Sequence, residues 1–333
     1  MTAPGAGPSG EDALIARYFK PLATEPGAFG LLDDAAILEP SRDDLVLKTD
    51  AIVEGVHFLP NDPPDTVARK ALRRNLSDLA AKGATPAGFL LTLALRSADE
   101  AWLTPFARGL GEDARQYGCP LFGGETVSTP GPIMISISAF GHVPAGSMVR
   151  RSGARPGDRV VVTGTIGDAV LGLDISRGGS VASVLTDNTS AREMLVGRYR
   201  VPQPRNSLAK AVRDHASAAM DVSDGLAGDL AKLCAASGVS AAIDIASIPL
   251  SAPAAAVLAS GALGIEALIS GGDDYEILCA IPESRFDPFA EAAGLAGVAV
   301  SSIGTVISGA SGPKFLDAQG RDVRLARLSY SHF

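Results

Sequence analysis

Two segments in the second half of the sequence restrict the fold most, because in each an apolar run leads through a short turn into a helical pattern. One is VVVTGTIGDAVLGL at residues 160–173, and the other is AAMDVSDGLAGDLAKLC at residues 218–234. A strand that leads directly into a helix is the repeating unit of α/β folds. The second half is therefore predicted to be α/β, with strands at 159–163, 241–245, 275–281 and 298–303 and a helix at 283–294.

The first half of the sequence shows longer helical patterns. An apolar stripe at helical spacing marks residues 65–82, and a second helix is predicted at 98–117. Residues 133–139 alternate apolar residues with serine or methionine, as in a strand that is buried on one face. A basic connector, RRSGARPGD at 150–158, follows. We therefore predict a flexible tail at 1–12, an N-terminal domain at 13–150 and a C-terminal α/β domain at 151–333.

Composition and targeting signals exclude several classes of function. Lys+Arg 29 and Asp+Glu 37 give a net charge of −8, whereas binding of nucleic acid depends mainly on Lys and Arg. The longest apolar run, at 87–95, is too short to cross a bilayer, and no signal-peptide pattern opens the sequence. Three widely spaced cysteines fit neither a disulfide framework nor a zinc site. We expect a cytoplasmic protein that binds neither nucleic acid nor a membrane.

Acidic residues at turns are the chemical signal of this sequence. Any single one fits a turn or a helix cap, as Ser223-Asp224-Gly225 fits the cap of a helix that begins near Leu226. Two of them follow a Gly-Gly pair, at 123–125 and 271–273, and paired glycines allow a close approach of the backbone. Clustered carboxylates need cations, and Mg²⁺ is typically held by one or two carboxylates plus substrate phosphates. The set therefore predicts Mg²⁺–nucleotide or Mg²⁺–phosphate chemistry; it comprises Asp33, Asp34, Asp50, Asp78, Glu125, Asp221, Asp224, Asp273 and Asp274.

Other catalytic architectures lack their signatures here. No lysine follows a glycine, so a Walker A loop is excluded. No G-x-S-x-G elbow, no histidine pair at zincin spacing and no protein-kinase motif occurs. Phosphate must therefore be bound by a different arrangement.

The residues alone do not decide the roles of three further features. His57, seven residues after Asp50, fits a substrate contact as well as a packed edge. Arg151 fits bidentate phosphate binding or a solvated connector. The segment GTIGD at 164–168 fits an anion cradle before a helix or tight packing, and packing is favoured.

An ordered series of motifs resembles the thiamine-monophosphate kinase family, which belongs to the superfamily of aminoimidazole ribonucleotide synthetase and selenophosphate synthetase. The resemblance runs from about residue 13 to residue 333. One such motif alone would be weak evidence for the family, whereas the ordered series is specific to it. Its members are LIARYF (14–19), DDAAIL (33–38), TDAIVEGVHF (49–58), NLSDLAAKGA (75–84), RSGARPGD (151–158), DVSDGL (221–226), SGGDDYE (270–276) and YSHF (330–333).

The resemblance implies a fold, a reaction and an assembly. The fold would be α/β (α+β) with two domains, and the N-terminal half would bind ATP and Mg²⁺ and contribute a β-barrel-like interface to a homodimer. The enzyme would transfer the γ-phosphoryl group of ATP to thiamine monophosphate, assisted by several Mg²⁺ ions, in the last step of thiamine diphosphate biosynthesis. A phosphate acceptor is already anionic at neutral pH, so no general base is assigned.

The resemblance also implies site residues, position by position. The implied metal ligands are Asp34, Thr49, Asp50, Asp78, Glu125, Asp221 and Asp224. ATP would contact Gly124, Glu125, Arg151 and Ser223, and thiamine monophosphate would contact His57, Asp273 and Tyr330. Asp50, Asp224 and Arg151 would be the catalytic residues.

Four positions depart from the family pattern. Glu125 stands where the family has Asp, and Asp273 where it has Glu; Leu32 and Lys48 also differ. No carboxylate is lost, so we interpret these as variation within an active enzyme. The alternatives are a catalytically silent regulator that binds nucleotide or divalent metal, a Mg²⁺-dependent phosphatase, or another synthetase of the superfamily.

Overall fold

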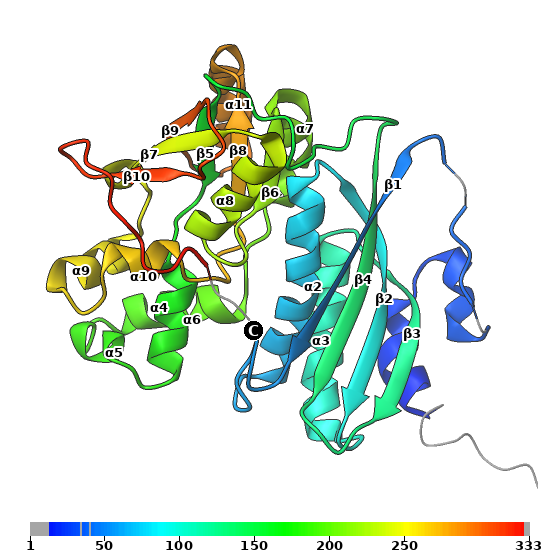
Figure 1. The fold of residues 1–333 in the computed structure, drawn as a ribbon. Helices are drawn as coiled ribbons and strands as arrows, with labels where there is room; N and C mark the ends of the chain where they lie inside the picture. Colours follow the sequence, from blue (N-terminus) through cyan, green and yellow to red (C-terminus); the bar gives the residue numbers. More distant parts are fainter. Residues whose placement is uncertain (1–12, 34, 40, 330–333) are drawn as a thin grey trace, which may run out of the picture. The chain divides into compact units, whose positions relative to one another are not determined.

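The computed structural model describes residues 13–33, 35–39 and 41–329, which form two compact units (Figure 1). The first unit comprises Met1–Asn75 and Pro86–His142, and the second comprises Leu76–Thr85 and Val143–Phe333. The main part of the second unit therefore begins at Val143, whereas the sequence predicts a boundary between residues 150 and 151. The second unit also includes a short segment from the first half of the sequence.

Within the part of the chain that the structure describes, the first unit is built on a four-stranded sheet with the order β1-β4-β2-β3, in which β2 and β3 run parallel. Helices α2 (Pro64–Ala81) and α3 (Glu100–Gln116) accompany it (Figure 1). The N-terminal segment forms the short turns η1 (Ile15–Phe19), η2 (Lys20–Leu22) and η3 (Pro26–Leu31). The strands are β1 (Asp44–Val53), β2 (Thr85–Leu95), β3 (Leu121–Ser128) and β4 (Met134–Val143).

Alternation along β1 gives the sheet two different faces. Val46 and Ile52 are buried, whereas Leu45 and Leu47 on the other face are exposed. Side chains of a strand alternate between the two faces of its sheet, so one face of β1 belongs to the core and the other does not.

A buried ion pair joins the two helices of the first unit. Asp113 on α3 is fully buried, and its carboxylate accepts hydrogen bonds from Arg73 Nε and Arg69 Nη1 of α2, each at 2.5 Å. Asp99 caps α3 by accepting a hydrogen bond from the N–H of Ala101 at 3.0 Å. These contacts fix the helices relative to each other beside the sheet.

The second unit is built on a six-stranded sheet, as far as the described residues show, with the order β10-β7-β9-β5-β8-β6. Neighbouring strands from β7 to β6 are antiparallel, and β10 pairs parallel with β7. The strands are β5 (Arg159–Thr163), β6 (Ala218–Asp221), β7 (Ser240–Asp244), β8 (Ile277–Ile281), β9 (Val300–Ile307) and β10 (Lys314–Leu316).

Helices of the second unit enclose separate apolar cores. Helix α8 (Leu226–Ser237) contributes Leu230 to one core, and α7 (Ala209–His215) and α11 (Glu283–Leu295) contribute Val212 and Phe289 to another. A third core lies among α4 and its neighbours. The remaining helical segments are α4 (Asp168–Ser176), α5 (Val181–Val184), α6 (Thr189–Arg200), α9 (Ala252–Ser260), α10 (Ile265–Ile269), η4 (Asn206–Leu208) and η5 (Ile245–Ser247).

The α/β fold class predicted from the sequence is confirmed. Both strand–turn–helix segments form as expected, β5 leading to α4 and β6 leading to α8. The strand predicted at 159–163 has those bounds, and the helix predicted at 65–82 is shifted by one residue at each end. Of the helices that the structure describes, none combines the length and the apolarity needed to cross a membrane.

Candidate active site

Strand β1 presents two of the implied metal ligands on opposite faces. Ser138 Oγ of β4 donates a hydrogen bond to Thr49 Oγ1 at 3.0 Å, on the exposed face. Lys48 Nζ lies 3.2 Å from Asp50 Oδ1 on the other face. The side chain of Asp50 is a quarter exposed, so its carboxylate is accessible and carries a cation beside it.

His57 lies in the turn that follows β1. The N–H of Val53 donates to His57 Nδ1 at 3.1 Å. A neutral imidazole that accepts at Nδ1 has its proton on Nε2. Glu54 fixes the same turn by pairing with Arg96 and accepting the N–H of Ile133 at 3.1 Å. The neutral ring therefore carries its N–H on Nε2.

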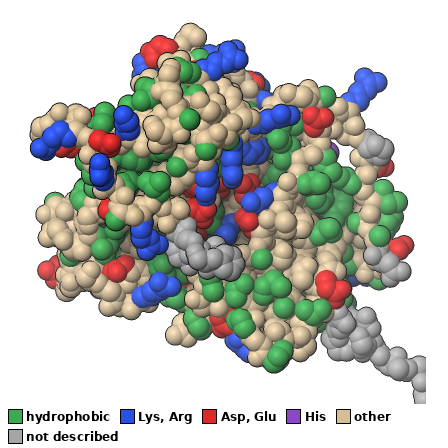
Figure 2. Space-filling model, viewed as in Figure 1, with side chains coloured by type: hydrophobic (Ala, Val, Ile, Leu, Met, Phe, Trp, Pro, Cys, Tyr) green, Lys and Arg blue, Asp and Glu red, His purple; other side chains and the backbone are tan. Residues whose placement is uncertain are grey.

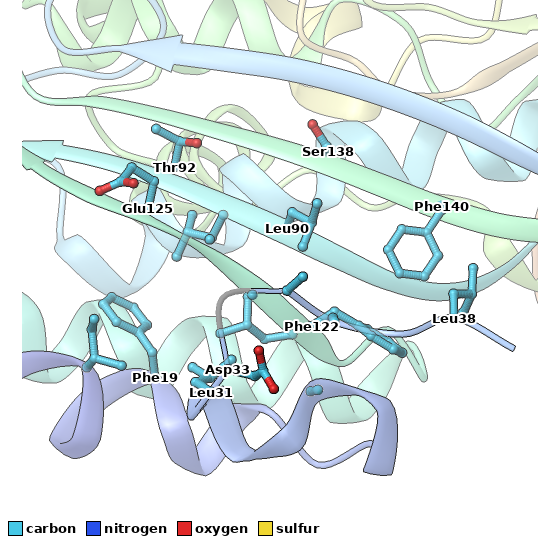
Figure 3. Close-up of a pocket in the computed structure, with 18 of the residues that line it drawn as sticks. Phe19, Leu31, Asp33, Leu38, Leu90, Thr92, Phe122, Glu125, Ser138 and Phe140 are labelled. Carbon is cyan, nitrogen blue, oxygen red and sulfur yellow. The ribbon is translucent and has the colours of Figure 1, made fainter. Parts of the chain in front are cut away.

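A pocket of about 740 Å³ lies in the first unit between the N-terminal segment and strands β2, β3 and β4 (Figure 3). Glu125 and Thr92 stand side by side on paired strands. Asp33 enters the lining from the N-terminal segment, and apolar side chains such as Phe122 and Phe140 complete it. Asp34, the implied metal ligand next to Asp33, lies outside the described residues.

Both Gly-Gly pairs allow a close approach between backbone segments of the chain itself. A Cβ on Gly124 would lie 1.9 Å from the carbonyl oxygen of Leu91 on β2. A Cβ on Gly272 would lie 2.5 Å from the carbonyl oxygen of Ser223. Packing of the chain against itself therefore explains these glycines.

Lys82 joins three elements of the second unit. Its Nζ donates to the carbonyl oxygen of Ala219 on β6 at 2.6 Å, and its own carbonyl accepts the N–H of Val149 at 3.2 Å. The N–H of Ala219 donates to the carbonyl of Arg150 at 2.9 Å. The end of α2, the segment before residue 151 and β6 are thereby held together.

The charges around Lys82 include three predicted site residues. Burial lowers the pKa of Lys82 to about 8, and the charge of Arg151 lowers it further, whereas Asp221 and Asp78 oppose the shift. A charge affects a pKa in this way only at short range. The structure therefore brings Asp78, Arg151 and Asp221 together around one lysine.

The loop after β6 carries Ser223 and Asp224. Helix α8 begins at Leu226 with Gly225 as its N-cap, at φ +110°, and no side chain caps it there. The step Ser223-Asp224-Gly225 therefore does supply the N-cap of the helix predicted to begin near Leu226, through the backbone of Gly225. Asp229 Oδ2, fully buried in the first turns of α8, accepts the N–H groups of Ser223 and Asp224, each at 2.9 Å.

Residues 273–275 are tied to that loop. The N–H of Asp273 donates to the carbonyl of Ser223 at 2.9 Å, and the N–H of Tyr275 donates to the carbonyl of Val222 at 2.8 Å. Asp273 and Tyr275 adopt positive φ values of 72° and 52°, which are rare for residues with side chains. Tyr275 Oη donates to Asp273 Oδ1 at 2.9 Å. The Asp273 carboxylate is thus held beside Ser223 by backbone and side-chain contacts.

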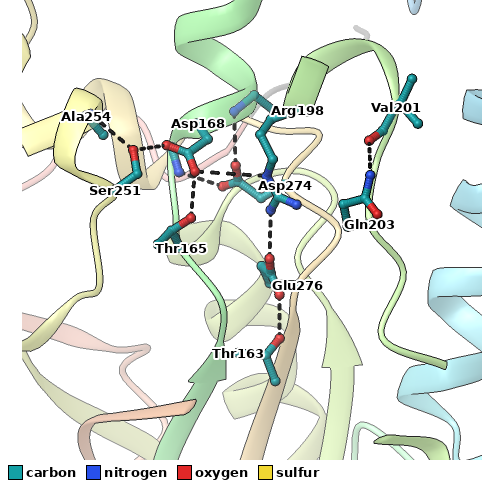
Figure 4. Close-up of polar contacts among 12 residues, drawn as sticks. Thr163, Thr165, Asp168, Arg198, Val201, Gln203, Ser251, Ala254, Asp274 and Glu276 are labelled. Carbon is teal, nitrogen blue, oxygen red and sulfur yellow. Dashed lines mark hydrogen bonds and ion pairs between the residues drawn. The ribbon is translucent and has the colours of Figure 1, made fainter. Parts of the chain in front are cut away.

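The carboxyl group of Asp274 binds to the turn at 164–168. The sequence alone did not decide whether this turn is an anion cradle or a site of tight packing. The Asp274 carboxyl group accepts the N–H of Gly167 at 2.9 Å and that of Ala169 at 3.3 Å (Figure 4). Burial raises the pKa of Asp274 well above its ordinary value. The turn therefore binds a carboxyl group of its own chain. Tight packing, the interpretation that the sequence favoured for this segment, describes the arrangement best.

Glu276 is buried in the same region and bonds to side chains from several elements (Figure 4). Its carboxylate accepts Thr163 Oγ1 at 2.6 Å, Arg198 Nη2 at 2.7 Å and Arg205 Nε at 2.7 Å. It stands at the start of β8, one residue after Tyr275, and so fixes the strand end from which the 273–275 turn projects.

Sequence reasoning did not identify Asp229, Lys232 or Glu276 as parts of the site. A local signal existed for the first pair, because Asp229 and Lys232 stand three residues apart in a helix directly after DVSDGL. No such signal existed for Glu276, whose arginine partners come from α6 and the loop after it. Tyr330, an implied substrate contact, lies outside the described residues.

Comparison with known proteins identifies the family. Residues 32–143 match the AIR synthase related protein, N-terminal domain, and residues 155–313 match the AIR synthase related protein, C-terminal domain. A thiamine-monophosphate kinase of Caulobacter vibrioides is 45% identical over 337 residues, which cover 99% of this chain and 93% of that relative. This chain belongs to the thiamine-monophosphate kinase family.

Solved structures of the thiamine-monophosphate kinase family share the fold. The enzyme from Stenotrophomonas maltophilia superposes with a TM-score of 0.81 at 34% identity, covering 94% of this chain and 98% of the other. A structure described as AaThiL complexed with AMPPCP and TMP has a TM-score of 0.75 at 31% identity, covering 92% and 97%. The family resemblance carried by the ordered motifs is therefore confirmed.

Proposed function

We propose that this chain transfers the γ-phosphoryl group of ATP to thiamine monophosphate, giving thiamine diphosphate and ADP in the last step of thiamine diphosphate biosynthesis. The observation that carries the proposal is the 45% identity to a thiamine-monophosphate kinase over nearly the whole length of both chains. The solved relative with AMPPCP, an analogue of ATP, and TMP supports the choice of substrates. We place the reaction in the cytoplasm.

The residues present suit Mg²⁺ ions. Among the described residues no three His, Cys, Asp or Glu side chains form a ready-made metal cage. Mg²⁺ does not need one, because it is typically held by one or two carboxylates plus substrate phosphates. Asp50 and Asp224 each have a lysine ammonium within 3.2 Å, which shows carboxylates accessible to positive charge. We assign the metal ligands to Asp34, Thr49, Asp50, Asp78, Glu125, Asp221 and Asp224.

Phosphoryl transfer requires two anions, the γ-phosphoryl group of ATP and the phosphate of thiamine monophosphate, to approach each other in line. Bound Mg²⁺ would neutralise phosphate charge. Arg151 would clamp a phosphate with its guanidinium, and Ser223 would contact ATP from the loop that Asp229 fixes. Gly124 and Glu125 would contact ATP from the pocket of the first unit. No residue is needed as a general base, because the acceptor phosphate is already anionic at neutral pH.

Thiamine monophosphate would be recognised by His57, Asp273 and Tyr330. His57 would donate a hydrogen bond from Nε2 to the substrate phosphate, in keeping with the acceptor role of its Nδ1. The carboxylate of Asp273 suits the positive charge of the thiazolium ring. Asp273 is one methylene shorter than the Glu of the family pattern, and its contact with Tyr275 Oη sets where it points.

We further propose that the chain forms a homodimer through the exposed face of the first unit's sheet, with a β-barrel-like interface. Figure 2 shows hydrophobic side chains exposed over this unit. Leu47 and Val127 are 73% and 43% exposed on β1 and β3. Exposed apolar side chains on one face of a sheet suit such an interface.

One assay tests the function against its alternatives. The purified chain is incubated with ATP, Mg²⁺ and thiamine monophosphate, and the thiamine species are separated by chromatography. Formation of thiamine diphosphate with one ADP per turnover supports the proposal. A silent regulator would give no ADP above background, a phosphatase would release inorganic phosphate and form no diphosphate, and another superfamily synthetase would leave thiamine monophosphate unchanged.

A further inference from the structure

Lys232 lies between two carboxylates that have different surroundings. Its Nζ donates to Asp224 Oδ2 at 2.5 Å and to Asp229 Oδ1 at 2.8 Å. Asp229 is fully buried, and its other oxygen is occupied by two backbone N–H groups of the loop. The side chains of Asp224 and Lys232 are 38% and 40% exposed. One partner of Lys232 is therefore fixed in the core, and the other reaches solvent.

This arrangement makes the two contacts of Lys232 unequal. Asp229 has no space for a further ligand, because helix α8 and the loop amides surround it. Asp224 can accept a different cation from the solvent side. If the ammonium loses its bond to Asp224, Asp229 still holds it, so no buried charge is left without compensation.

We propose that Lys232 sets the affinity of the Asp224 carboxylate for divalent cations. Without a cation the ammonium bridges Asp224 and Asp229, and when a cation binds Asp224 the ammonium keeps its bond to Asp229. The inference rests on the metal-ligand role given to Asp224 under the proposed function. Lys48 beside Asp50, with Nζ 3.2 Å from Oδ1, is a second lysine next to an implied ligand, so the pairing recurs in the chain.

The physical reason is competition between like charges. A divalent ion at Asp224 is repelled by the ammonium and must break its hydrogen bond. Solvent screens a pair that is this exposed, so the effect is modest, about three- to tenfold in affinity. Replacing Lys232 with an uncharged side chain of similar size should therefore strengthen cation binding at Asp224.

The test measures Mn²⁺ binding to the nucleotide-free protein by calorimetry and by the electron paramagnetic resonance signal of free Mn²⁺. Lys232→Met should lower the Mn²⁺ Kd about three- to tenfold, and Lys232→Gln should do the same. Lys210→Met is the matched control, because Lys210 pairs with Asp214 at the surface of the same unit and its loss changes the net charge equally. That variant should leave the Kd unchanged.

A double-mutant cycle assigns the effect to Asp224. Asp224→Asn should weaken Mn²⁺ binding, and adding Lys232→Met to it should change the Kd no further. An unchanged or higher Kd in both Lys232 variants, or an equal gain in the Asp224→Asn background, would overturn the inference. Because no substrate is present, this result is separate from the proposed function, which fails if the unaltered chain forms no thiamine diphosphate.

Discussion

Lys82 illustrates how a single buried charge links stability to pH. Burial lowers its pKa from 10.5 to about 8, so between these values the folded chain binds fewer protons than the unfolded chain. The free energy of unfolding must then rise with pH over that range. The rise disappears below about pH 7, where Lys82 is protonated in both states.

The first prediction follows from this shift. Between pH 7.5 and 9.5, in metal-free buffer, the unaltered chain should gain about 2 kcal/mol in the free energy of unfolding relative to Lys82→Met. Urea denaturation of both proteins at several pH values measures the difference. Parallel curves for the two proteins would show that Lys82 titrates normally.

The second prediction concerns the carboxylate that Lys232 contacts. Asp224→Asn removes a charge that should hold Mg²⁺ against phosphate, so turnover at saturating Mg²⁺ should fall at least about 100-fold. Thiamine diphosphate formation measures it, and Asp214→Asn, a change at an exposed ion pair of the same unit, should leave turnover unchanged. Near-normal turnover of Asp224→Asn would contradict the metal role.

His57 gives a third prediction, which separates binding from catalysis. His57→Ala removes one hydrogen-bond donor to thiamine monophosphate, so KM for that substrate should rise about tenfold and kcat should change less. Steady-state kinetics with each substrate varied in turn measures both constants. A rise confined to KM for ATP would place the ring elsewhere in the reaction.

At the scale of elements, Glu276 ties the start of β8 to β5 through Thr163 and to the α6 region through two arginines. Glu276→Gln removes a fully buried charge from two ion pairs and should cost about 3 kcal/mol in the free energy of unfolding. The control is Glu283→Gln, because Glu283 pairs with Arg159 at the surface and should cost less than about 1 kcal/mol. Equal urea midpoints for the two variants would refute a special role for the buried pair.

The elements also show what the sequence can and cannot specify. The strand at 159–163 was predictable because its apolar run and the following glycine are local signals. The placement of β5 between β8 and β9 was not, since antiparallel pairing depends on contacts between distant residues. The same holds for the candidate site: motifs predicted Asp224 as a member, whereas the buried carboxylate of Asp229 that fixes its loop is visible only in the folded chain.

At the scale of the whole molecule, the first unit's sheet exposes apolar side chains on the face through which we propose that two copies pair. Leu47 is 73% exposed at the centre of β1, on the face opposite the core. If two copies pair through this face, a charge at Leu47 would be buried without a partner, at a cost of several kcal/mol. Leu295, which is 87% exposed at the end of α11 in the second unit, offers a matched control.

The last prediction is therefore about assembly. The unaltered chain and Leu295→Lys should sediment as dimers, whereas Leu47→Lys should sediment mainly as a monomer at micromolar concentration. Sedimentation velocity measures the distribution, and circular dichroism checks that each variant is folded. Because Thr49 lies on the same face of β1 as Leu47, a dimer that persists in Leu47→Lys would place the interface elsewhere and would leave this face, with Thr49 and Ser138, open to solvent.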